Sequence, residues 1–251
     1  MNKRIISAAA VIFSACAVMA GAAEMPSYVN HSGAQGRARV LIIGDSITYS
    51  NCSSKSSGLC GWRAAAAKHC GQPDGAYVFD TLSQIGISAY KVNSAFPDTY
   101  GPNDSSFIKN ENYDAAFIML GINDIGNGQG SLPRLEKSYT ALLSKVSALN
   151  VGRIYMISVL PNCRYRNDLR PAAAKKVVEF NAFLKTLVSD KVRFLNVYGE
   201  MEDSSDRGCL SSAYAGPDYL HPKNDLRTQS VLSGFIMNEL KKDSDNPLTC
   251  R

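Results

Sequence analysis

Short apolar runs alternate with longer stretches of helical periodicity along most of the chain. The runs are rich in Val and Ile, are short enough for buried strands, and several stop at Gly or Pro. They cover residues 39–43, 77–82, 115–120, 153–160 and 193–197. The helical stretches cover residues 61–70, 132–149, 171–188 and 222–240. Strands that alternate with helices predict an α/β fold, in which a parallel sheet carries helices on both faces.

The composition is that of one globular domain. The chain has 251 residues, of which 45% are hydrophobic and 20% are charged, and no clear linker divides it. The net charge is +5, but two of the basic residues, Lys3 and Arg4, lie in the N-terminal leader. No run of Lys and Arg stands out, so nucleic acid is not an expected partner.

The first 23 residues have the features of a cleavable secretory signal. Lys3 and Arg4 give the basic start, and residues 5–20 are apolar and small. Gly21-Ala22-Ala23 offers small side chains before a cut. The apolar run is short for a membrane span, which disfavours an uncleaved anchor.

Lipidation of Cys16 is a further alternative for the leader, but the bulky Phe13 fits that signal poorly. We therefore expect residues 1–23 to be removed and residues 24–251 to form a single secreted or periplasmic domain. No stable membrane anchor is expected.

Removal of the leader leaves an even number of cysteines, which favours disulfides in an exported chain. They are Cys52, Cys60, Cys70, Cys163, Cys209 and Cys250. No Cys-x-x-Cys motif or cluster of His and Cys indicates a metal site, and neither a metal nor another cofactor is expected. A catalytic cysteine is disfavoured, because oxidising compartments pair accessible thiols.

Three polar motifs follow predicted strands at their carboxyl ends, where open α/β sheets bind ligands. The first is Gly44-Asp45-Ser46-Ile47-Thr48. It places the hydroxyl of Ser46 in the tight turn after the first strand. A serine becomes a good nucleophile only when a base removes its proton, and a lone serine here would merely cap a turn or a helix.

A histidine must supply the base. The chain has three, which are His31, His69 and His221. Only His221 is placed by a motif, because Asp218 stands three residues before it. One turn can hold the Asp218 carboxylate against one ring nitrogen and leave the other nitrogen for Ser46. The segment also resembles a helix N-terminus with Pro222 in the first turn, and both interpretations can hold together.

The oxyanion that develops during ester cleavage needs preorganised hydrogen-bond donors. Asn123, in the block Gly121-Ile122-Asn123-Asp124, offers a side-chain amide after the third strand. Gly86 offers a backbone N–H after the second strand, with no Cβ to block close approach. The N–H of Ser46 would be a third donor. Taken alone, the Asn123 block is a turn signal and Gly86 carries no information.

Together these blocks resemble the SGNH hydrolases, the group that contains the GDSL esterases and lipases. The resemblance spans residues 39–240. It implies Ser46 as nucleophile, Gly86 and Asn123 as oxyanion donors, His221 as base and Asp218 as its acid. The second block departs from the family pattern at Ala89, and the first block lacks the glycine that often follows it. These departures concern loop shape rather than chemistry.

The resemblance also implies a flavodoxin-like three-layer sandwich with a five-stranded parallel sheet in the order 2-1-3-4-5. On that topology the cysteines form three neighbouring pairs. The first pair shares the loop after the first strand. The second pair follows the fourth and fifth strands, which are neighbours, and the third follows the first and last helices, which cover the same face. The expected disulfides are Cys52–Cys60, Cys163–Cys209 and Cys70–Cys250.

The sequence therefore predicts an exported, monomeric serine esterase that forms an acyl-serine intermediate. Aromatic side chains near the active-edge loops suit sugar rings, although loop packing explains them equally well. They are Tyr49, Trp62, Tyr90, Tyr165, Tyr214 and Tyr219. The loops are polar and show no long apolar lid, which favours an acetylated carbohydrate, although other small-molecule esters remain possible substrates.

Three alternatives are a lipase- or lysophospholipase-type acyl hydrolase, a sugar O-acyltransferase with the same acyl-enzyme, and a noncatalytic binding protein. The intact set of Ser46, Asn123, Asp218 and His221 argues against a binding protein, which needs no such set.

Overall fold

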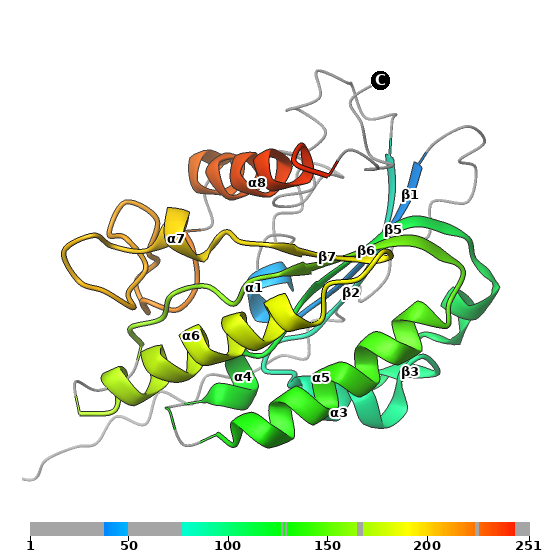
Figure 1. The fold of residues 1–251 in the computed structure, drawn as a ribbon, viewed down its shortest axis with the longest axis horizontal. Helices are drawn as coiled ribbons and strands as arrows, with labels where there is room; N and C mark the ends of the chain where they lie inside the picture. The colour runs from blue at the N-terminus through cyan, green and yellow to red at the C-terminus, as the bar shows by residue number, and fades with distance from the viewer. Residues whose placement is uncertain are drawn as a thin grey trace, which may run out of the picture.

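A five-stranded parallel sheet forms the centre of the molecule. The computed structural model describes residues 38–49, 77–126, 128, 130–164, 168–223 and 226–243. The strands are β1 Ala38–Gly44, β2 Tyr77–Ser83, β5 Tyr113–Met119, β6 Val151–Ile157 and β7 Val192–Leu195. Their order is β2-β1-β5-β6-β7, and every neighbouring pair is parallel (Figure 1). Counted along the chain, these five strands have the order 2-1-3-4-5, so the predicted sheet is confirmed.

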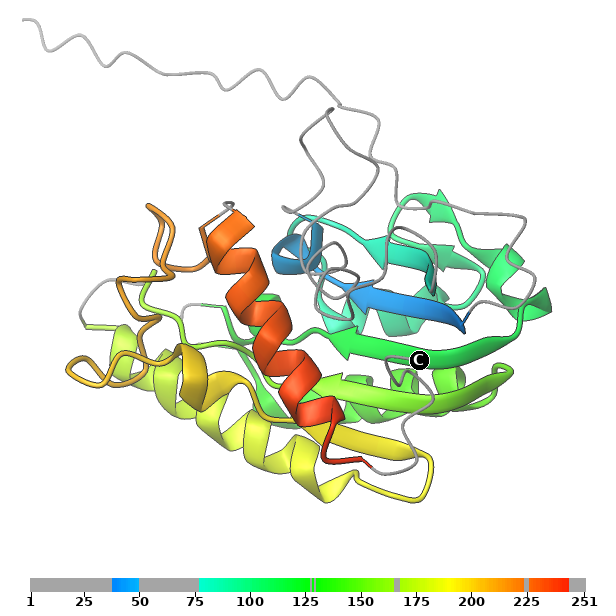
Figure 2. The ribbon, with the colours of Figure 1, turned by 90° about the horizontal axis from the view of Figure 1, so that it is seen from above.

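Helices cover both faces of this sheet and make three layers. One face carries α3 Ala89–Ala95, α5 Leu132–Ser147 and α6 Arg170–Thr186 (Figure 1). The other carries α8 Leu226–Leu240, which lies across the sheet when the molecule is seen from above (Figure 2). Short helices follow three of the strands, namely α1 Ser46–Tyr49, α4 Ile122–Ile125 and α7 Tyr198–Met201. A hairpin of β3 Thr99–Tyr100 and β4 Asn103–Asp104 precedes the 3-10 helix η2 Ser106–Asn110.

The core lies between the central strands and the helices that pack on them. Residues 40–43 of β1 are consecutive and fully buried, because both faces of a parallel sheet are covered. On α5 the fully buried side chains recur at helical spacing, as Leu135, Tyr139, Leu142 and Val146. The ring of Tyr139 meets Phe180 of α6 edge-on, with 5.5 Å between the ring centroids. The apolar pattern of the sequence is thus the pattern of this core.

Several element boundaries differ from the sequence prediction. β6 ends at Ile157 instead of residue 160, because the backbone of Val159 bonds to a side chain rather than to a strand. The N–H of Val159 donates to Oδ1 of Asn181 at 2.8 Å, and Nδ2 of Asn181 donates to the Val159 carbonyl at 2.9 Å. β7 is also shorter than predicted and ends at Leu195.

The last helix starts later than its sequence pattern indicates. α8 begins at Leu226, so the prediction that Pro222 lies in its first turn is wrong. Pro222 instead forms an antiparallel bridge with Ala215, and the N–H of Lys223 donates to the carbonyl of Tyr214 at 2.7 Å. These bonds close a separate turn before the helix. The helix predicted at residues 61–70 lies outside the described residues.

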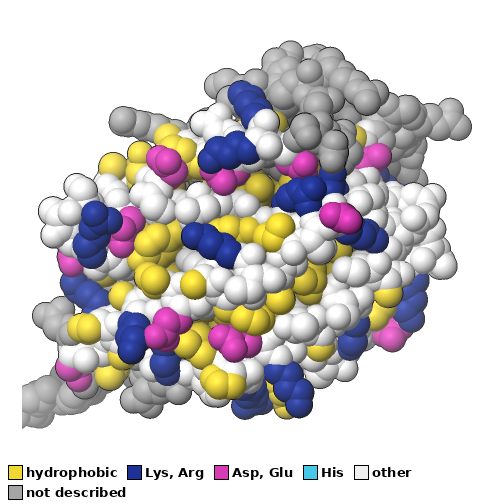
Figure 3. Space-filling view, in the orientation of Figure 1, with side chains coloured by type: hydrophobic (Ala, Val, Ile, Leu, Met, Phe, Trp, Pro, Cys, Tyr) yellow, Lys and Arg dark blue, Asp and Glu magenta, His cyan; other side chains and the backbone are white. Residues whose placement is uncertain are grey.

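Ionic contacts anchor the chain after α8 at the amino end of the sheet. Asp243 accepts a hydrogen bond from Tyr155 at 3.0 Å and lies 3.4 Å from the Arg153 side chain and 3.7 Å from that of Arg193. On the face shown in Figure 3, basic and acidic side chains are interspersed around a band of apolar ones.

Of the helices that the structure describes, none combines the length and the apolar character that crossing a membrane requires.

Candidate active site

Ser46 lies in the turn between β1 and α1, at the carboxyl edge of the sheet. Gly44 ends the strand without a side chain, and a Cβ there would stand 2.0 Å from Oγ1 of Thr48. The hydroxyl of Tyr100 donates to the carbonyl of Gly44 at 2.5 Å. The close packing against Gly44 and this bond hold the turn, and they leave Ser46 only 5% exposed. The side chain of Ser46 is therefore buried at the carboxyl edge of the sheet.

A continuous chain of hydrogen bonds joins Ser46 to the segment before α8. Oγ of Ser46 lies 2.8 Å from Nε2 of His221, and Nδ1 of His221 lies 2.6 Å from Oδ2 of Asp218. With the ring proton on Nδ1, the histidine donates to the carboxylate and presents the Nε2 lone pair to the serine. The structure thus brings together the three residues that the sequence singled out, in the order that proton transfer from serine requires.

A tight turn holds Asp218 and His221 in this relation. Oδ1 of Asp218 accepts hydrogen bonds from the N–H groups of Leu220 and His221, at 3.1 and 3.0 Å. Partial burial opposes ionisation of this carboxyl, but these bonds and the histidine ring hold the pKa of Asp218 below its usual value. Asp218 is therefore an ionised partner for the imidazole.

Asn123 comes from α4, directly after β5, and ties two blocks of the site together. Its Nδ2 donates to the carbonyl of Ile87 at 2.9 Å. A primary amide carries two N–H donors, so one remains for a ligand. The preceding Gly121 has φ 129°, and a Cβ there would lie 2.6 Å from the Phe180 ring. Only glycine allows the chain to enter α4 in this way.

Gly86 lies in the exposed turn after β2. Its φ is 71°, in the region that glycine adopts without strain, and a Cβ there would meet no atom within 4 Å. The conformation, not crowding, is therefore what calls for glycine at this position. The turn is held from one side by the Asn123 bond to Ile87, so the backbone near Gly86 is linked to the Asn123 block.

Two carboxyl groups of these loops have a raised pKa, namely that of Asp45, which is fully buried, and that of Asp124, which is half-buried. Burial raises the pKa of Asp45 to about 7; the N–H of Ile47 donates to it at 2.9 Å and opposes the rise, while the Asp124 charge adds to it. Burial also raises the pKa of Asp124, although it accepts hydrogen bonds from the N–H groups of Ala89 and Tyr90 at 2.8 and 3.2 Å. These bonds fasten the first turn of α3 to the Asn123 block.

Neither carboxyl was assigned a role from the sequence. Asp45 and Asp124 are visible there as members of their motifs, but the motifs do not show that Asp45 is buried and Asp124 half-buried. Tyr100, which holds the carbonyl of Gly44, also escaped prediction, because no local pattern connects a residue so distant in the chain with the first block.

A cavity of about 350 Å³ adjoins the Gly86 turn. Its walls include Ile85, Lys91, Ser94, Gly101 and Pro102. It offers room for part of a ligand beyond the reacting atoms. A larger open groove of about 670 Å³ lies at the amino end of β5 and β6, and none of the predicted site residues lines it.

One disulfide joins the segments that follow β6 and β7. It links Cys163 to Cys209, one of the three expected pairs. Among the described residues these two sulfurs and Asp206 form the only group with metal-ligand proximity, and the sulfurs are bonded to each other rather than available as thiolates. The expected pairs Cys52–Cys60 and Cys70–Cys250 lie outside the described residues, as do His31 and His69.

Comparisons with known proteins agree with this arrangement. The chain matches the family described as GDSL-like Lipase/Acylhydrolase over residues 42–225. A search of curated proteins found no match.

Several solved structures share the fold. The lipase Lip_vut3 from a goat rumen metagenome has a TM-score of 0.60 and 14% identity, covering 80% of this chain and 97% of that one. A carbohydrate esterase family 3 protein from Talaromyces cellulolyticus has a TM-score of 0.56 and 16% identity, covering 82% and 97%. Axe2, an acetylxylan esterase from Geobacillus stearothermophilus, has a TM-score of 0.56 and 16% identity, covering 80% and 93%.

Proposed function

The chain belongs to the GDSL-like lipase/acylhydrolase family and is a carboxylic ester hydrolase, and we propose that it deacetylates a carbohydrate through an acyl-Ser46 intermediate. The observation that carries the chemistry is the unbroken chain of hydrogen bonds from Ser46 through His221 to Asp218, at 2.8 and 2.6 Å. A hydroxyl, an imidazole and an ionised carboxylate in this order are the parts that an activated serine needs.

In the proposed first step, Nε2 of His221 takes the proton of Ser46 while Oγ attacks the ester carbonyl carbon. The carbonyl π electrons move onto oxygen, and the Asn123 amide with the N–H groups of Gly86 and Ser46 stabilises this oxyanion. Asp218 stabilises the imidazolium. Collapse of the intermediate breaks the bond to the alcohol oxygen, which leaves with the proton from His221. Water then attacks the acyl-serine in the same way and releases the carboxylic acid.

The second amide hydrogen of Asn123 supports this role. Because the bond to the Ile87 carbonyl occupies one N–H, the amide plane is fixed and the other N–H is preorganised for a ligand. Preorganised donors stabilise a developing charge without reorganisation at the moment of reaction, which is why they contribute strongly to catalysis.

Exposed aromatic rings beside the site support a carbohydrate substrate. Tyr219 stands between Asp218 and His221 in the chain and is 55% exposed, and Tyr90, whose N–H bonds to Asp124, is 48% exposed. The guanidinium of Arg134 lies 3.6 Å from the centroid of the Tyr90 ring. Exposed aromatic rings of this kind offer flat apolar faces with a polar edge, which suit sugar rings.

Tyr214, which lies shortly before Asp218 in the chain, packs against the last helix. The ring of Tyr214 packs edge-on against Phe235 of α8, with 6.4 Å between the centroids. It therefore belongs to the packing between the turn and the last helix. Two of the similar structures are carbohydrate esterases by their descriptions, and this likeness is in accord with the proposal without identifying a substrate.

The test of the substrate is a panel of acetylated xylan, other acetylated polysaccharides and p-nitrophenyl esters of increasing chain length. We expect kcat/KM to be highest for acetyl esters of saccharides and to fall with acyl length. Tyr90→Ala should lower kcat/KM about 10-fold on saccharide esters through the loss of ring stacking, and should change it little on p-nitrophenyl acetate.

The matched control for this panel is Val178→Ala, which removes an exposed apolar side chain of α6. It should leave both rates unchanged. A preference for long acyl chains would favour a lipase, and acetyl transfer to an added saccharide in place of release of acetate would favour a transferase. Equal losses on both substrates for Tyr90→Ala would contradict a saccharide-binding role.

We also propose that residues 1–23 are a cleaved signal and that the enzyme is exported. The disulfide Cys163–Cys209 supports this, because such bonds persist in oxidising compartments. The mass of the mature protein purified from the periplasm or the medium tests it. Retention of the leader in a cytoplasmic protein with free thiols would contradict the proposal.

A further inference from the structure

The turn that carries Asp218 and His221 is closed by its own hydrogen bonds. The N–H of Gly216 donates to the carbonyl of His221 at 2.8 Å, and the N–H of Tyr219 donates to the carbonyl of Gly216 at 3.1 Å. These bonds fix Asp218 relative to His221. They do not fix the distance from His221 to Ser46, because Ser46 belongs to the end of β1 and lies 175 residues away in the chain.

A backbone contact from outside reaches this turn between its two functional residues. The N–H of Cys163 donates to the carbonyl of Tyr219 at 3.2 Å. Tyr219 has φ 54°, and it is the only non-glycine residue with positive φ among the described residues. Such a conformation persists where the surroundings hold it in place. The hydrogen bond from Cys163 therefore stabilises the turn at Tyr219, the residue with the unfavourable backbone conformation.

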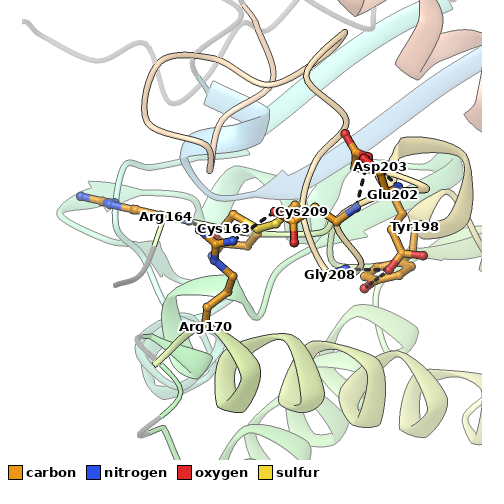
Figure 4. Close-up of a disulfide and its surroundings, with 11 residues drawn as sticks. Cys163, Arg164, Arg170, Tyr198, Glu202, Asp203, Gly208 and Cys209 are labelled. Carbon is orange, nitrogen blue, oxygen red and sulfur yellow. Dashed lines mark hydrogen bonds and ion pairs between the residues drawn. A yellow bond between two sulfur atoms is a disulfide. The ribbon is translucent and has the colours of Figure 1, made fainter. Parts of the chain in front are cut away.

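Two contacts join Cys163 and its neighbour Asn162 to the segment that follows α7. Its sulfur is bonded to that of Cys209, and both residues are buried, at 7% and 4% exposure (Figure 4). The N–H of the neighbouring Asn162 donates to the carbonyl of Gly208 at 2.8 Å. The disulfide thus fixes the position of the Cys163 backbone, and through it the Tyr219 carbonyl.

Several bonds hold together the segment that carries Cys209. The N–H of Asp203 donates to the carbonyl of Cys209 at 2.8 Å, and Glu202 forms a backbone bridge with Leu210. Oε1 of Glu202 accepts the hydroxyl of Tyr198 at 3.0 Å and the N–H of Gly208 at 2.8 Å (Figure 4). Because these bonds hold Cys209 in place, the disulfide can in turn hold the backbone of Cys163.

We propose that the disulfide Cys163–Cys209 is a positioning element for the Asp218–His221 turn, so that ester cleavage depends on its oxidised state. This inference rests on the catalytic roles proposed above. Reduction by a dithiol would break the S–S bond with two electrons and two protons, form two thiols and convert the dithiol into its own disulfide. The turn would then keep its internal bonds, and the backbone bond from Asn162 to Gly208 would remain, but the covalent part of the support that places His221 against Ser46 would be lost. Leu220 is buried beside it and limits the displacement, so the loss is partial.

The test compares wild type with Cys163→Ala/Cys209→Ala on p-nitrophenyl acetate, which needs no saccharide recognition. We expect kcat to fall ~10-fold or more and KM to stay within about 2-fold, because misplacement of the base affects the reaction more than binding. The rate at which a fluorophosphonate labels Ser46 should fall in parallel. A dithiol should lower the kcat of wild type by a larger factor than that of the variant, in which only the other expected disulfides remain to be reduced.

Asp243→Asn is the control for a general loss of stability, since it weakens ion pairs at the opposite end of the sheet. It should lower the melting temperature with kcat unchanged. If the alanine pair does not fold, Cys163→Val/Cys209→Ala retains more apolar volume and carries the same test.

A wild-type protein without turnover would overturn the proposed function and this inference with it. If wild type turns over and the folded double variants have the same kcat as wild type, the inference alone would be overturned.

Discussion

Asp45 gives the sharpest prediction about stability, because its carboxyl is fully buried and directly precedes Ser46 in the chain. Burial raises its pKa to about 7 from the ordinary value of 3.8. The folded protein therefore binds this proton more tightly than the unfolded chain, and the free energy of unfolding falls as pH rises between these values. Three pKa units correspond to about 4 kcal/mol, of which about 3 kcal/mol is lost between pH 5 and pH 8.

Asp45→Asn removes the ionisation while retaining an oxygen that accepts the N–H of Ile47. We expect the free energy of unfolding of Asp45→Asn, minus that of wild type, to increase by about 3 kcal/mol from pH 5 to pH 8. Urea denaturation at several pH values measures this difference, and contributions shared by the two proteins cancel.

Glu179→Gln on α6 changes an exposed carboxylate and is the control for this experiment. Its difference from wild type should stay nearly flat over the same range. If the Asp45→Asn difference were also flat, Asp45 would not be a protonated acid near neutral pH, and the account of its burial would be wrong.

Three further predictions concern the site residues. Asn123→Ala should lower kcat by about 10²-fold with a small effect on KM, as steady-state kinetics will show, and a change within a fewfold would reduce Asn123 to a turn residue. Hydrogen bonds hold the pKa of Asp218 below its usual value, so its carboxylate is ionised throughout the neutral range. Asp218→Asn should therefore lower kcat by about 10⁴-fold at every pH from 6 to 9, and recovery at one end of that range would contradict the role. Gly121→Ala should destabilise the protein by about 2 kcal/mol in urea denaturation, because φ 129° is strained for alanine and the Cβ meets Phe180; unchanged stability would refute this.

The sheet was predictable because its central strands are buried on both faces. Consecutive apolar residues such as 40–43 then stand out, and the polar blocks that follow the strands fall at one edge. The end of β6 was not predictable, because the side chain of Asn181 takes the place of a neighbouring strand at Val159. No local pattern records a hydrogen bond between residues so far apart.

In the site, too, local motifs were predictable from the sequence and tertiary contacts were not. That Ser46, His221 and Asp218 lie together could be predicted, because their spacing in short motifs has a direct chemical meaning. The left-handed conformation of Tyr219 could not, since most non-glycine residues avoid it and only tertiary contacts stabilise it. Pro222 misled the prediction for a related reason. Proline suits the first turn of a helix, but here the bridge to Ala215 holds it in an extended turn instead.

The central claim is that Ser46 is an acyl-accepting nucleophile activated by His221. The most direct measurement is intact-protein and peptide mass spectrometry after incubation with a fluorophosphonate, on wild type, Ser46→Ala and His221→Ala, beside turnover of p-nitrophenyl acetate. The account predicts one adduct on the peptide that contains Ser46, none in Ser46→Ala, much slower labelling in His221→Ala, and a fall in turnover of ~10³-fold or more in both variants. An adduct on another residue, or a Ser46→Ala variant that turns over like wild type, would contradict it.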